Sequence, residues 1–337
     1  MIFFKNFKRT IYWKYFLLLF LKPFYDFIWK YFINFHAKFL NFIWNFKKKE
    51  YFDLKNNNYL KITNNIKILN LVNELNNFCS KELLENSRNK MRQNKKWSNE
   101  LFDELPIDLK KKIIDFASSD LILTTASKYL GVFPILSRIY FYHNIVNENN
   151  KDEELSQKWH KDGMGYKGLD FFISITDIDE SNGPLYLSKQ KNPLGAFSKI
   201  ENSIQNPKKG ERNKIENEIF NKLHESEEID SIIGSKGTCI IVDSYNCYHK
   251  GGFMKEGDRV MLRIAFDTID STVVNFDDEK YKSDEVFYYN KMHKNDVKDS
   301  FMKFLFFKRS KFIKSINLSE KLLKFYQLLH YKINIKS

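Results

Sequence analysis

The motif Trp159-His160-Lys161-Asp162, followed by the apolar segment Leu169-Asp170-Phe171-Phe172-Ile173-Ser174-Ile175, is the most informative part of this sequence. Residues i and i+2 of a strand point to the same face, so His160 and Asp162 can present an imidazole nitrogen and a carboxylate oxygen to one metal ion. The apolar segment has the composition of a buried strand. The stretch therefore predicts two ligands of a metal site beside a buried β-sheet.

A third ligand and two candidate anion-binding residues come later in the chain. His249 lies between the runs 238–242 and 260–266, which both have the composition of buried strands. Two histidines and one carboxylate form a facial triad that leaves the opposite side of a ferrous ion open for a bidentate keto acid and dioxygen. Arg259 precedes the second run, and its planar fork suits a carboxylate. Arg263 shares its strand parity, so side-chain alternation leaves both arginines as candidates.

These motifs continue in a fixed order along the chain. The order is Trp159-His160-Lys161-Asp162, the turn Ser181-Asn182-Gly183-Pro184-Leu185, the strand opened by Gly237-Thr238, then His249 and Arg259. Between about Arg138 and Phe266 the series resembles the phytanoyl-CoA dioxygenase family of iron(II)- and 2-oxoglutarate-dependent oxygenases. The resemblance implies that Fe(II) is bound by His160, Asp162 and His249, and that the far carboxylate of 2-oxoglutarate is bound by Arg259. Only the family spacing favours Arg259 over Arg263.

The resemblance also bears on the reaction. Tyr142 and Phe172 match positions that contact the keto acid in the family, although aromatic residues on strands are usually core. Phe172 stands where relatives can have tryptophan, and Gly251 lacks a hydroxyl that relatives use on the co-substrate. Some halogenating relatives carry a small residue at the position of Asp162. The retained aspartate therefore favours hydroxylation by dioxygen, with release of succinate and CO2.

The fold that the resemblance implies is mainly β with flanking α, a double-stranded β-helix (jelly-roll, cupin-like) core with helices packed around it. We expect residues 137–285 to form the oxygenase core, with a charged insertion at 192–230. Residues 51–136 are expected to form a helical region bracing the barrel, and 286–337 a basic helical segment.

The bracing region contains two well-marked helices. Leu105-Pro106 introduces a helix over Leu109–Ala117, since proline is tolerated in a first turn. A second helix over Asp120–Leu130 ends at Gly131, a suitable C-cap. Ser137–Val146 is expected to be the first core strand.

Residues 1–50 are predicted to form a basic, aromatic, amphipathic helical segment. Charged residues interrupt it too often for the roughly 20-residue apolar run that crosses a bilayer. A drifting polar stripe lies opposite a broad apolar face, and Lys47-Lys48-Lys49 follows. Such a helix can lie in the interface of an anionic membrane. Packing on the catalytic domain or on a second subunit is the alternative.

Composition limits the other classes of partner. Lys and Arg number 55 against 42 Asp and Glu, a formal charge of +13, but no nucleic-acid-binding fingerprint accompanies it, so no nucleic-acid partner is expected. Cys79, Cys239 and Cys247 lack metal-binding or redox spacing, which indicates reduced residues of a cytoplasmic protein. The substrate is expected to be a small molecule or a lipid-linked one, and the oligomeric state stays open.

Two other functional classes fit the sequence. One is a cupin-like metal enzyme that uses the triad without 2-oxoglutarate, and the other is a non-catalytic, membrane-attached binding protein with a relict pocket. The remaining histidines are expected at the surface; they are His36, His143, His224, His293 and His330.

Overall fold

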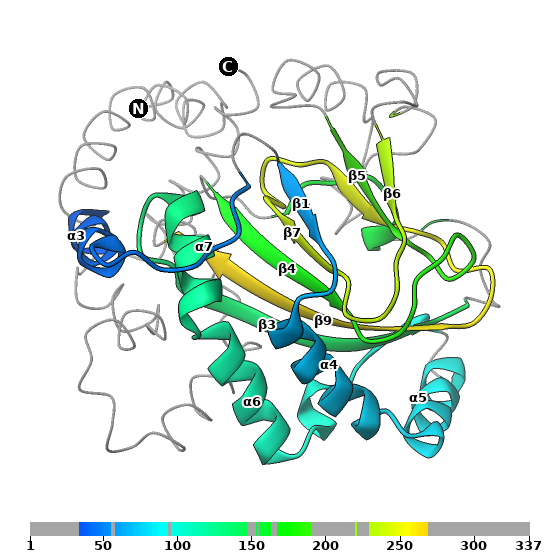
Figure 1. Cartoon of the computed structure of the whole chain (residues 1–337). Coiled ribbons are helices and arrows are strands. Elements are labelled where there is room, and N and C mark those ends of the chain that lie inside the picture. The colour runs from blue at the N-terminus through cyan, green and yellow to red at the C-terminus, as the bar shows by residue number, and fades with distance from the viewer. Residues whose placement is uncertain are drawn as a thin grey trace, which may run out of the picture.

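The computed structural model describes residues 34–54, 58–93, 96–146, 153, 155–162, 167–189, 220 and 229–268. Its β structure consists of two antiparallel sheets (Figure 1). The larger has six strands in the order β1-β7-β4-β9-β3-β2, and the smaller has three in the order β6-β5-β8. The strands are β1 Tyr59–Ile62, β2 Ser98–Glu100, β3 Ile135–Ile145, β4 Gly168–Ser174, β5 Leu185–Ser188, β6 Ile229–Ile232, β7 Cys239–Val242, β8 His249–Gly251 and β9 Asp258–Asp267.

The two sheets pack face to face. Phe172, Ile240 and Met261 of the large sheet share one apolar cluster with Leu187 and Ile232 of the small sheet. Strands distant in sequence are neighbours within each sheet, as β4 lies between β7 and β9. Facing antiparallel sheets with this non-sequential order form the expected jelly-roll. The predicted class, mainly β with flanking helices, is therefore confirmed.

Strand alternation divides the core into two layers. Phe171 packs with the helices, whereas its neighbour Phe172 packs toward the small sheet. All seven residues of β4 are buried. A strand covered on both faces reads as a continuous apolar run, which is why this segment was recognisable in the sequence.

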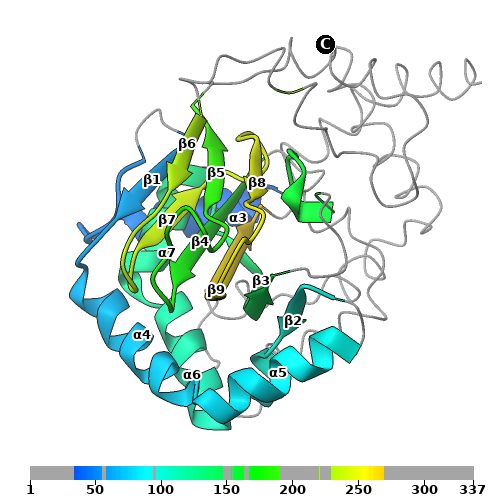
Figure 2. The ribbon, with the colours of Figure 1, turned by 90° about the vertical axis from the view of Figure 1, so that its right-hand side faces the viewer.

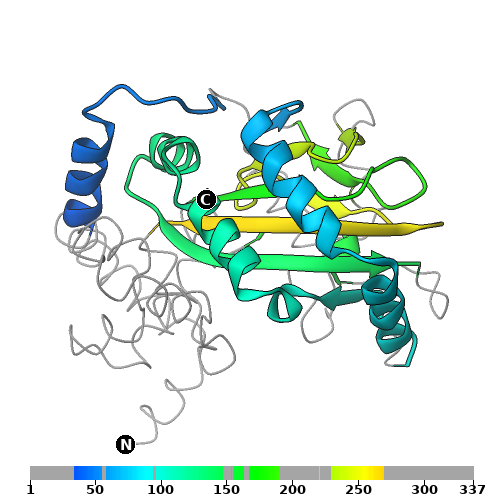
Figure 3. The same ribbon diagram turned by 60° about the horizontal axis from the view of Figure 1, so that its bottom comes forward.

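Helices cover the outer face of the large sheet (Figures 2 and 3). The described helices are α3 Asn34–Asn45, α4 Ile66–Phe78, α5 Lys81–Gln93, α6 Ile107–Ala117 and α7 Asp120–Leu130, with short 3-10 turns at Phe102–Glu104 and Leu155–Gln157. Helices α4 and α7 contact β4, α6 packs between them, α5 contacts β2 and β3, and α3 packs on α7. The turn at Leu155–Gln157 instead contacts β8 of the small sheet. The two predicted bracing helices are confirmed as α6 and α7, and α6 begins directly after Pro106. Gly131 ends α7 with φ 72°, a left-handed conformation that favours glycine. The predicted strand Ser137–Val146 is β3, which begins two residues earlier at Ile135. It is not the first strand of the core, because β1 and β2 of the same sheet precede it within the segment 51–136 that was expected to be helical.

Several expectations fall on residues that the structure does not describe. The segment 286–337 lies outside the described residues, as do His224, His293 and His330 and all of 192–228 except Phe220. The N-terminal segment is described from Asn34 onward. Among the described helices, none has the length and apolar character needed to span a bilayer.

The prediction of a surface position for His143 is wrong. Its side chain is fully buried between β3 and α5. Nδ1 lies 3.0 Å from the hydroxyl of Ser87, and Nε2 lies 3.5 Å from Oδ2 of Asp258. Alternation along β3 turns His143 to the helix-covered face, and only the packing of α5 buries it.

Candidate metal centre

The three predicted metal ligands lie together between the two sheets. His160 and His249 face each other in an isolated antiparallel bridge, with backbone N–H···O distances of 3.0 and 2.9 Å. The backbone N–H of Asp162 donates to the carbonyl of Ser244 at 2.8 Å. One ligand atom from each of the three side chains lies within 4.8 Å of the others. Backbone pairing thus fixes the spacing of the ligands.

In each histidine, a hydrogen bond from Nδ1 to a backbone carbonyl orients the ring so that Nε2 faces the ligand cluster. Nδ1 of His160 lies 2.7 Å from the carbonyl oxygen of Lys158, and Nδ1 of His249 lies 3.0 Å from that of Cys247. A carbonyl only accepts, so each Nδ1 carries the hydrogen. The Nε2 atoms lie 3.5 and 3.7 Å from the Asp162 carboxylate oxygens. Metal-binding histidines are usually held by such outer hydrogen bonds, and two imidazoles with one carboxylate suit a ferrous ion.

Asp162 is held by Arg263. One guanidinium nitrogen, Nη2, donates both to Oδ2 of Asp162 and, at 2.7 Å, to Oδ2 of Asp170. Burial raises the pKa of Asp162, but the charge of Arg263 and the contacts with the two histidines outweigh it and hold that pKa well below its usual range. The carboxylate is therefore ionised and ready to bind a cation.

Arg259 has a different environment. It is 5% exposed, and its Nε and Nη2 donate to Oδ1 of Asn144 at 3.3 and 3.2 Å. Nη1 donates to the carbonyl of Gly183 in the predicted Asn-Gly turn. Within the described part of the chain, no carboxylate lies within 4.0 Å of this guanidinium. Burial lowers the pKa of Arg259, whereas the two aspartates overcome burial and raise that of Arg263.

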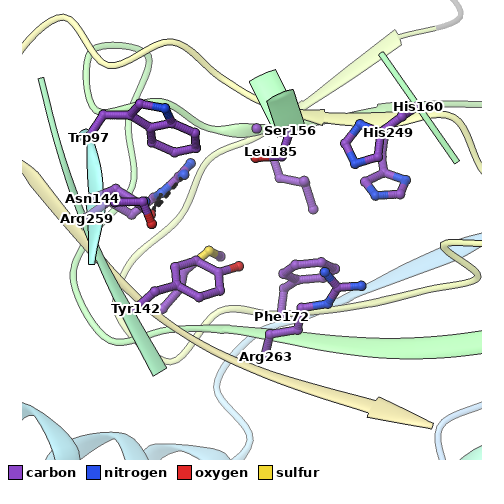
Figure 4. A pocket seen from close by; sticks show the side chains of 13 residues that line it. Trp97, Tyr142, Asn144, Ser156, His160, Phe172, Leu185, His249, Arg259 and Arg263 are labelled. Carbon is purple, nitrogen blue, oxygen red and sulfur yellow. Dashed lines mark hydrogen bonds between the residues drawn. The ribbon is translucent and has the colours of Figure 1, made fainter. Parts of the chain in front are cut away.

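A cavity of about 160 Å³ joins these groups. Figure 4 shows Arg259 and Asn144 at one end, the two histidines at the other, and Tyr142 between them. Burial raises the pKa of Tyr142, which keeps its phenol neutral and able to donate. Phe172 also lines the cavity, with its ring 5.0 Å below the guanidinium carbon of Arg263. The other lining residues are Trp97, Ser98, Ser156, Leu185, Gly251 and Met261.

Some of these residues were missed in the sequence. Asp170 is a lone carboxylate inside an otherwise uncharged buried strand, and that conflict was a usable signal. Asn144 gave a weaker one, as a buried amide within β3. Trp97 directly precedes β2 and Ser98 begins it, and β2 is the edge strand of the large sheet that is farthest from β1. Nothing in the local sequence indicates that they reach the cavity.

Comparisons with known proteins find similarity only among solved structures. No protein-family model matches the chain, and no curated protein matches it. EctD from S. alaskensis with 2-oxoglutarate and 5-hydroxyectoine is 14% identical, with a TM-score of 0.40 over 65% of this chain and 74% of that one. The epimerase SnoN in complex with Fe3+, alpha-ketoglutarate and nogalamycin RO is 10% identical, with a TM-score of 0.37 over 63% and 80%.

The non-heme monooxygenase ThoJ, in a nickel complex, is also 10% identical, with a TM-score of 0.33 over 64% of this chain and 75% of that one. Similarities this low assign no residue roles to the chain. Membership of the phytanoyl-CoA dioxygenase family stays a prediction.

Proposed function

We propose that the protein is an Fe(II)- and 2-oxoglutarate-dependent dioxygenase that hydroxylates a small-molecule or lipid-type substrate and releases succinate and CO2. One observation carries the proposal. A cavity has a three-ligand metal cluster at one end and, at the other, a buried arginine whose hydrogen-bond partners among the described residues are all neutral. The two ends match the two ends of a keto diacid.

Each residue has a definite task in this proposal. His160, His249 and Asp162 hold the metal, and Arg259 binds the distal carboxylate of 2-oxoglutarate. Asn144 orients the Arg259 guanidinium, since it accepts from two of its nitrogens. Iron with the keto acid bound supplies the oxidation of the substrate by dioxygen. Tyr142 and Phe172 narrow the cavity around the keto acid, and Tyr142 can donate a hydrogen bond to it.

The charges around the cavity support the pairing of a divalent metal with a dianion. Arg259 and Arg263 are balanced by Asp162 and Asp170, and the histidines are taken as neutral ligands. A divalent cation alone would leave two uncompensated charges in a largely buried site, which is costly. A dianionic keto acid cancels them. We therefore expect metal and 2-oxoglutarate each to strengthen the binding of the other.

The choice between the two arginines rests on their partners. Arg263 already contacts two carboxylates, so a third anion would gain little there. Arg259 is a buried cation bonded to neutral oxygens, and a bound carboxylate would complete its environment. This supports Arg259 as the keto-acid anchor.

The test needs no knowledge of the substrate. Fe(II) and 2-oxoglutarate are added to the purified protein without oxygen, and the visible metal-to-ligand charge-transfer band is recorded for the parent, His160→Ala and Arg259→Ala. We expect the band in the parent, its loss in the first variant and its weakening in the second. Replacement of the exposed Arg92 by alanine is the matched control and should leave the band unchanged.

Other outcomes would favour the other functional classes. A parent protein that binds iron but gives no band, and that turns over a substrate equally well with Arg259→Ala, would be a cupin-like metal enzyme without 2-oxoglutarate. A folded parent that binds no iron would contradict any metal enzyme and favour a non-catalytic binding protein.

We also propose that the protein is cytoplasmic and binds peripherally to an anionic membrane through α3. One face of α3 already packs on the protein: Ala37 and Leu40 are buried, and Nε1 of Trp44 donates to Thr124 of α7 at 3.1 Å. The opposite face carries large exposed apolar side chains. These are Phe39, Phe42 and Ile43, exposed by 50, 68 and 42%, and Phe46, which directly follows α3, is exposed by 79%.

Charge favours a lipid surface over another apolar protein as the partner of α3. Lys38, Lys47 and Lys48 are exposed beside these side chains, and the chain carries a net charge of +13. A basic helix with exposed aromatic residues is typical of binding in the membrane interface. The three cysteines are free thiols, in keeping with a reducing compartment.

Vesicle sedimentation tests this surface with the full chain. We expect binding to vesicles of phosphatidylserine and phosphatidylcholine, and its loss both in high salt and in a Phe42→Ser/Phe46→Ser variant. Ile66 and Ile107 are exposed by 66 and 46% on other helices, so Ile66→Ser/Ile107→Ser is the matched control. Equal vesicle binding by both double variants would contradict the proposal, and so would a parent dimer that the α3 variant dissociates.

A further inference from the structure

We propose that Arg263 is a positioning residue that holds the metal-binding carboxylate of Asp162 in a monodentate arrangement. The inference rests on the proposed function of this site as a metal centre. It gives the second arginine of the cavity a task distinct from that of Arg259.

Strand pairing places Arg263 beside an acidic partner. Arg259, Met261 and Arg263 alternate on β9 and all line the cavity. In the register between β4 and β9, Arg263 lies opposite Phe172, and Asp170 lies two residues earlier on the same face of β4. Diagonal neighbours of this kind are within reach of a long side chain. The contact between Arg263 and Asp170 is therefore built into the central ladder of the sheet.

The guanidinium has little freedom once it is in this position. Its Nη2 lies 2.7 Å from Oδ2 of Asp170, which is 2% exposed. Its central carbon also lies 5.0 Å from the ring centre of Phe172 and 6.0 Å from that of Tyr140. The ion pair with a buried carboxylate and the cation–π contacts with two aromatic rings together restrict the position of the group.

The same nitrogen, Nη2, donates to Oδ2 of Asp162. Both carboxylate oxygens face the ligand cluster, since Oδ1 lies 3.5 Å from Nε2 of His160 and Oδ2 lies 3.7 Å from Nε2 of His249. The hydrogen bond from Arg263 is what distinguishes them. An oxygen that accepts a charge-assisted hydrogen bond has less electron density to give a metal and is held in place. Oδ1 is then the ligand, and Oδ2 is kept for the arginine.

A monodentate aspartate matters because of what it leaves open. With one oxygen and two imidazole nitrogens bound, half of an octahedral coordination sphere stays free for other ligands. A carboxylate bound through both oxygens would remove one of those positions. Arg263 thus preserves the open face on which the proposed reaction depends.

An ordinary structural ion pair would give different results in an experiment. Loss of a structural pair lowers the stability of the protein but does not change how a bound metal is coordinated. The coordination of the metal is therefore the readout that separates the two roles. The ligand-field absorption of the Co(II)-loaded protein reports coordination number and geometry without any turnover.

Two variants test the inference from different sides. Arg263→Met combined with Asp170→Asn removes the pair without changing the net charge. Arg263→Lys keeps the charge, but its side chain is shorter and lacks the flat guanidinium that lies over Phe172 and Tyr140. Arg259→Met is the matched control, since it removes an arginine from the same strand and the same cavity. Each protein is titrated with Co(II) against a chelator, its visible spectrum is recorded, and its thermal unfolding is measured without metal.

We expect both Arg263 variants to show a changed ligand-field spectrum and a Co(II) affinity lower by about tenfold to a hundredfold, as for lost outer contacts of other metal ligands. Arg259→Met should keep the parent spectrum, and its Co(II) affinity should not fall, because the variant removes a positive charge from the cavity. Unchanged spectra in both Arg263 variants would overturn the inference and leave the proposed function intact. A parent that binds no Co(II) would overturn both. If the double variant does not fold, Arg263→Lys decides the matter.

Discussion

Replacement of Arg259 by methionine should remove the binding of the distal carboxylate of 2-oxoglutarate while preserving the metal ligands. Arg259 is 5% exposed, so water screens its charge only weakly. Breaking a buried, hydrogen-bonded ion pair by removing one partner costs about 3–5 kcal/mol. At about 1.4 kcal/mol per tenfold change, the dissociation constant should rise by more than a hundredfold.

An analogue without the distal carboxylate isolates this contact. The Fe(II)-loaded parent and Arg259→Met are titrated without oxygen with 2-oxoglutarate and with 2-oxopentanoate, and the charge-transfer band is followed. The parent should prefer 2-oxoglutarate by more than a hundredfold. The variant should bind the two acids within a few-fold of each other, because the group that distinguishes them is gone.

Thermal unfolding gives an independent measure of the same contact. At a 2-oxoglutarate concentration of 100 times its dissociation constant, the metal-loaded parent should gain about 2.7 kcal/mol of stability, and the variant almost none. A variant that still prefers the diacid by a hundredfold would refute the assignment of Arg259 as the anchor.

Three further predictions follow from the contacts of the cavity and of α5. Asn144→Leu removes the amide that accepts from two nitrogens of Arg259, and should weaken 2-oxoglutarate binding in the same titration by about tenfold, the equivalent of a hydrogen bond to a charged group. Gly183 has φ 76° and an added Cβ would lie 2.6 Å from a backbone oxygen, so Gly183→Ala should lower the melting temperature and displace the carbonyl that Arg259 contacts. Burial raises the pKa of Asp258, but its contacts with His143 and Arg88 outweigh burial and lower it to about 2. Because this pKa lies below the unfolded value of about 3.9, Asp258 contributes about 2 kcal/mol above pH 4 that is lost as the pH falls toward 2. Denaturant titrations between pH 6 and 2 should therefore show a shallower acid loss in Asp258→Asn than in the parent, and equal slopes would contradict the ion pair.

The local sequence was sufficient to predict those features that depend on a few adjacent residues. The spacing of His160 and Asp162 predicted that both could face one ion, and the structure brings them together with His249. The buried strand β4 was likewise predicted from its apolar run, and the end of α7 from its glycine. In each case the deciding property, strand alternation or glycine's tolerance of positive φ, belongs to a few adjacent residues.

The hydrogen-bond and ion-pair partners of the buried charged residues could not be predicted from the sequence. Arg259 and Arg263 have the same strand parity and similar neighbours along the chain, yet one is bonded to neutral oxygens and the other to two carboxylates. His143 looked like a surface residue until α5 was packed over it. The local sequence predicted the candidate ligand types, their spacing and the mainly β fold. The hydrogen-bond partners of each arginine followed from the three-dimensional fold alone, because those contacts depend on the pairing of β4 with β9 and of β3 with β9, between segments far apart in the chain.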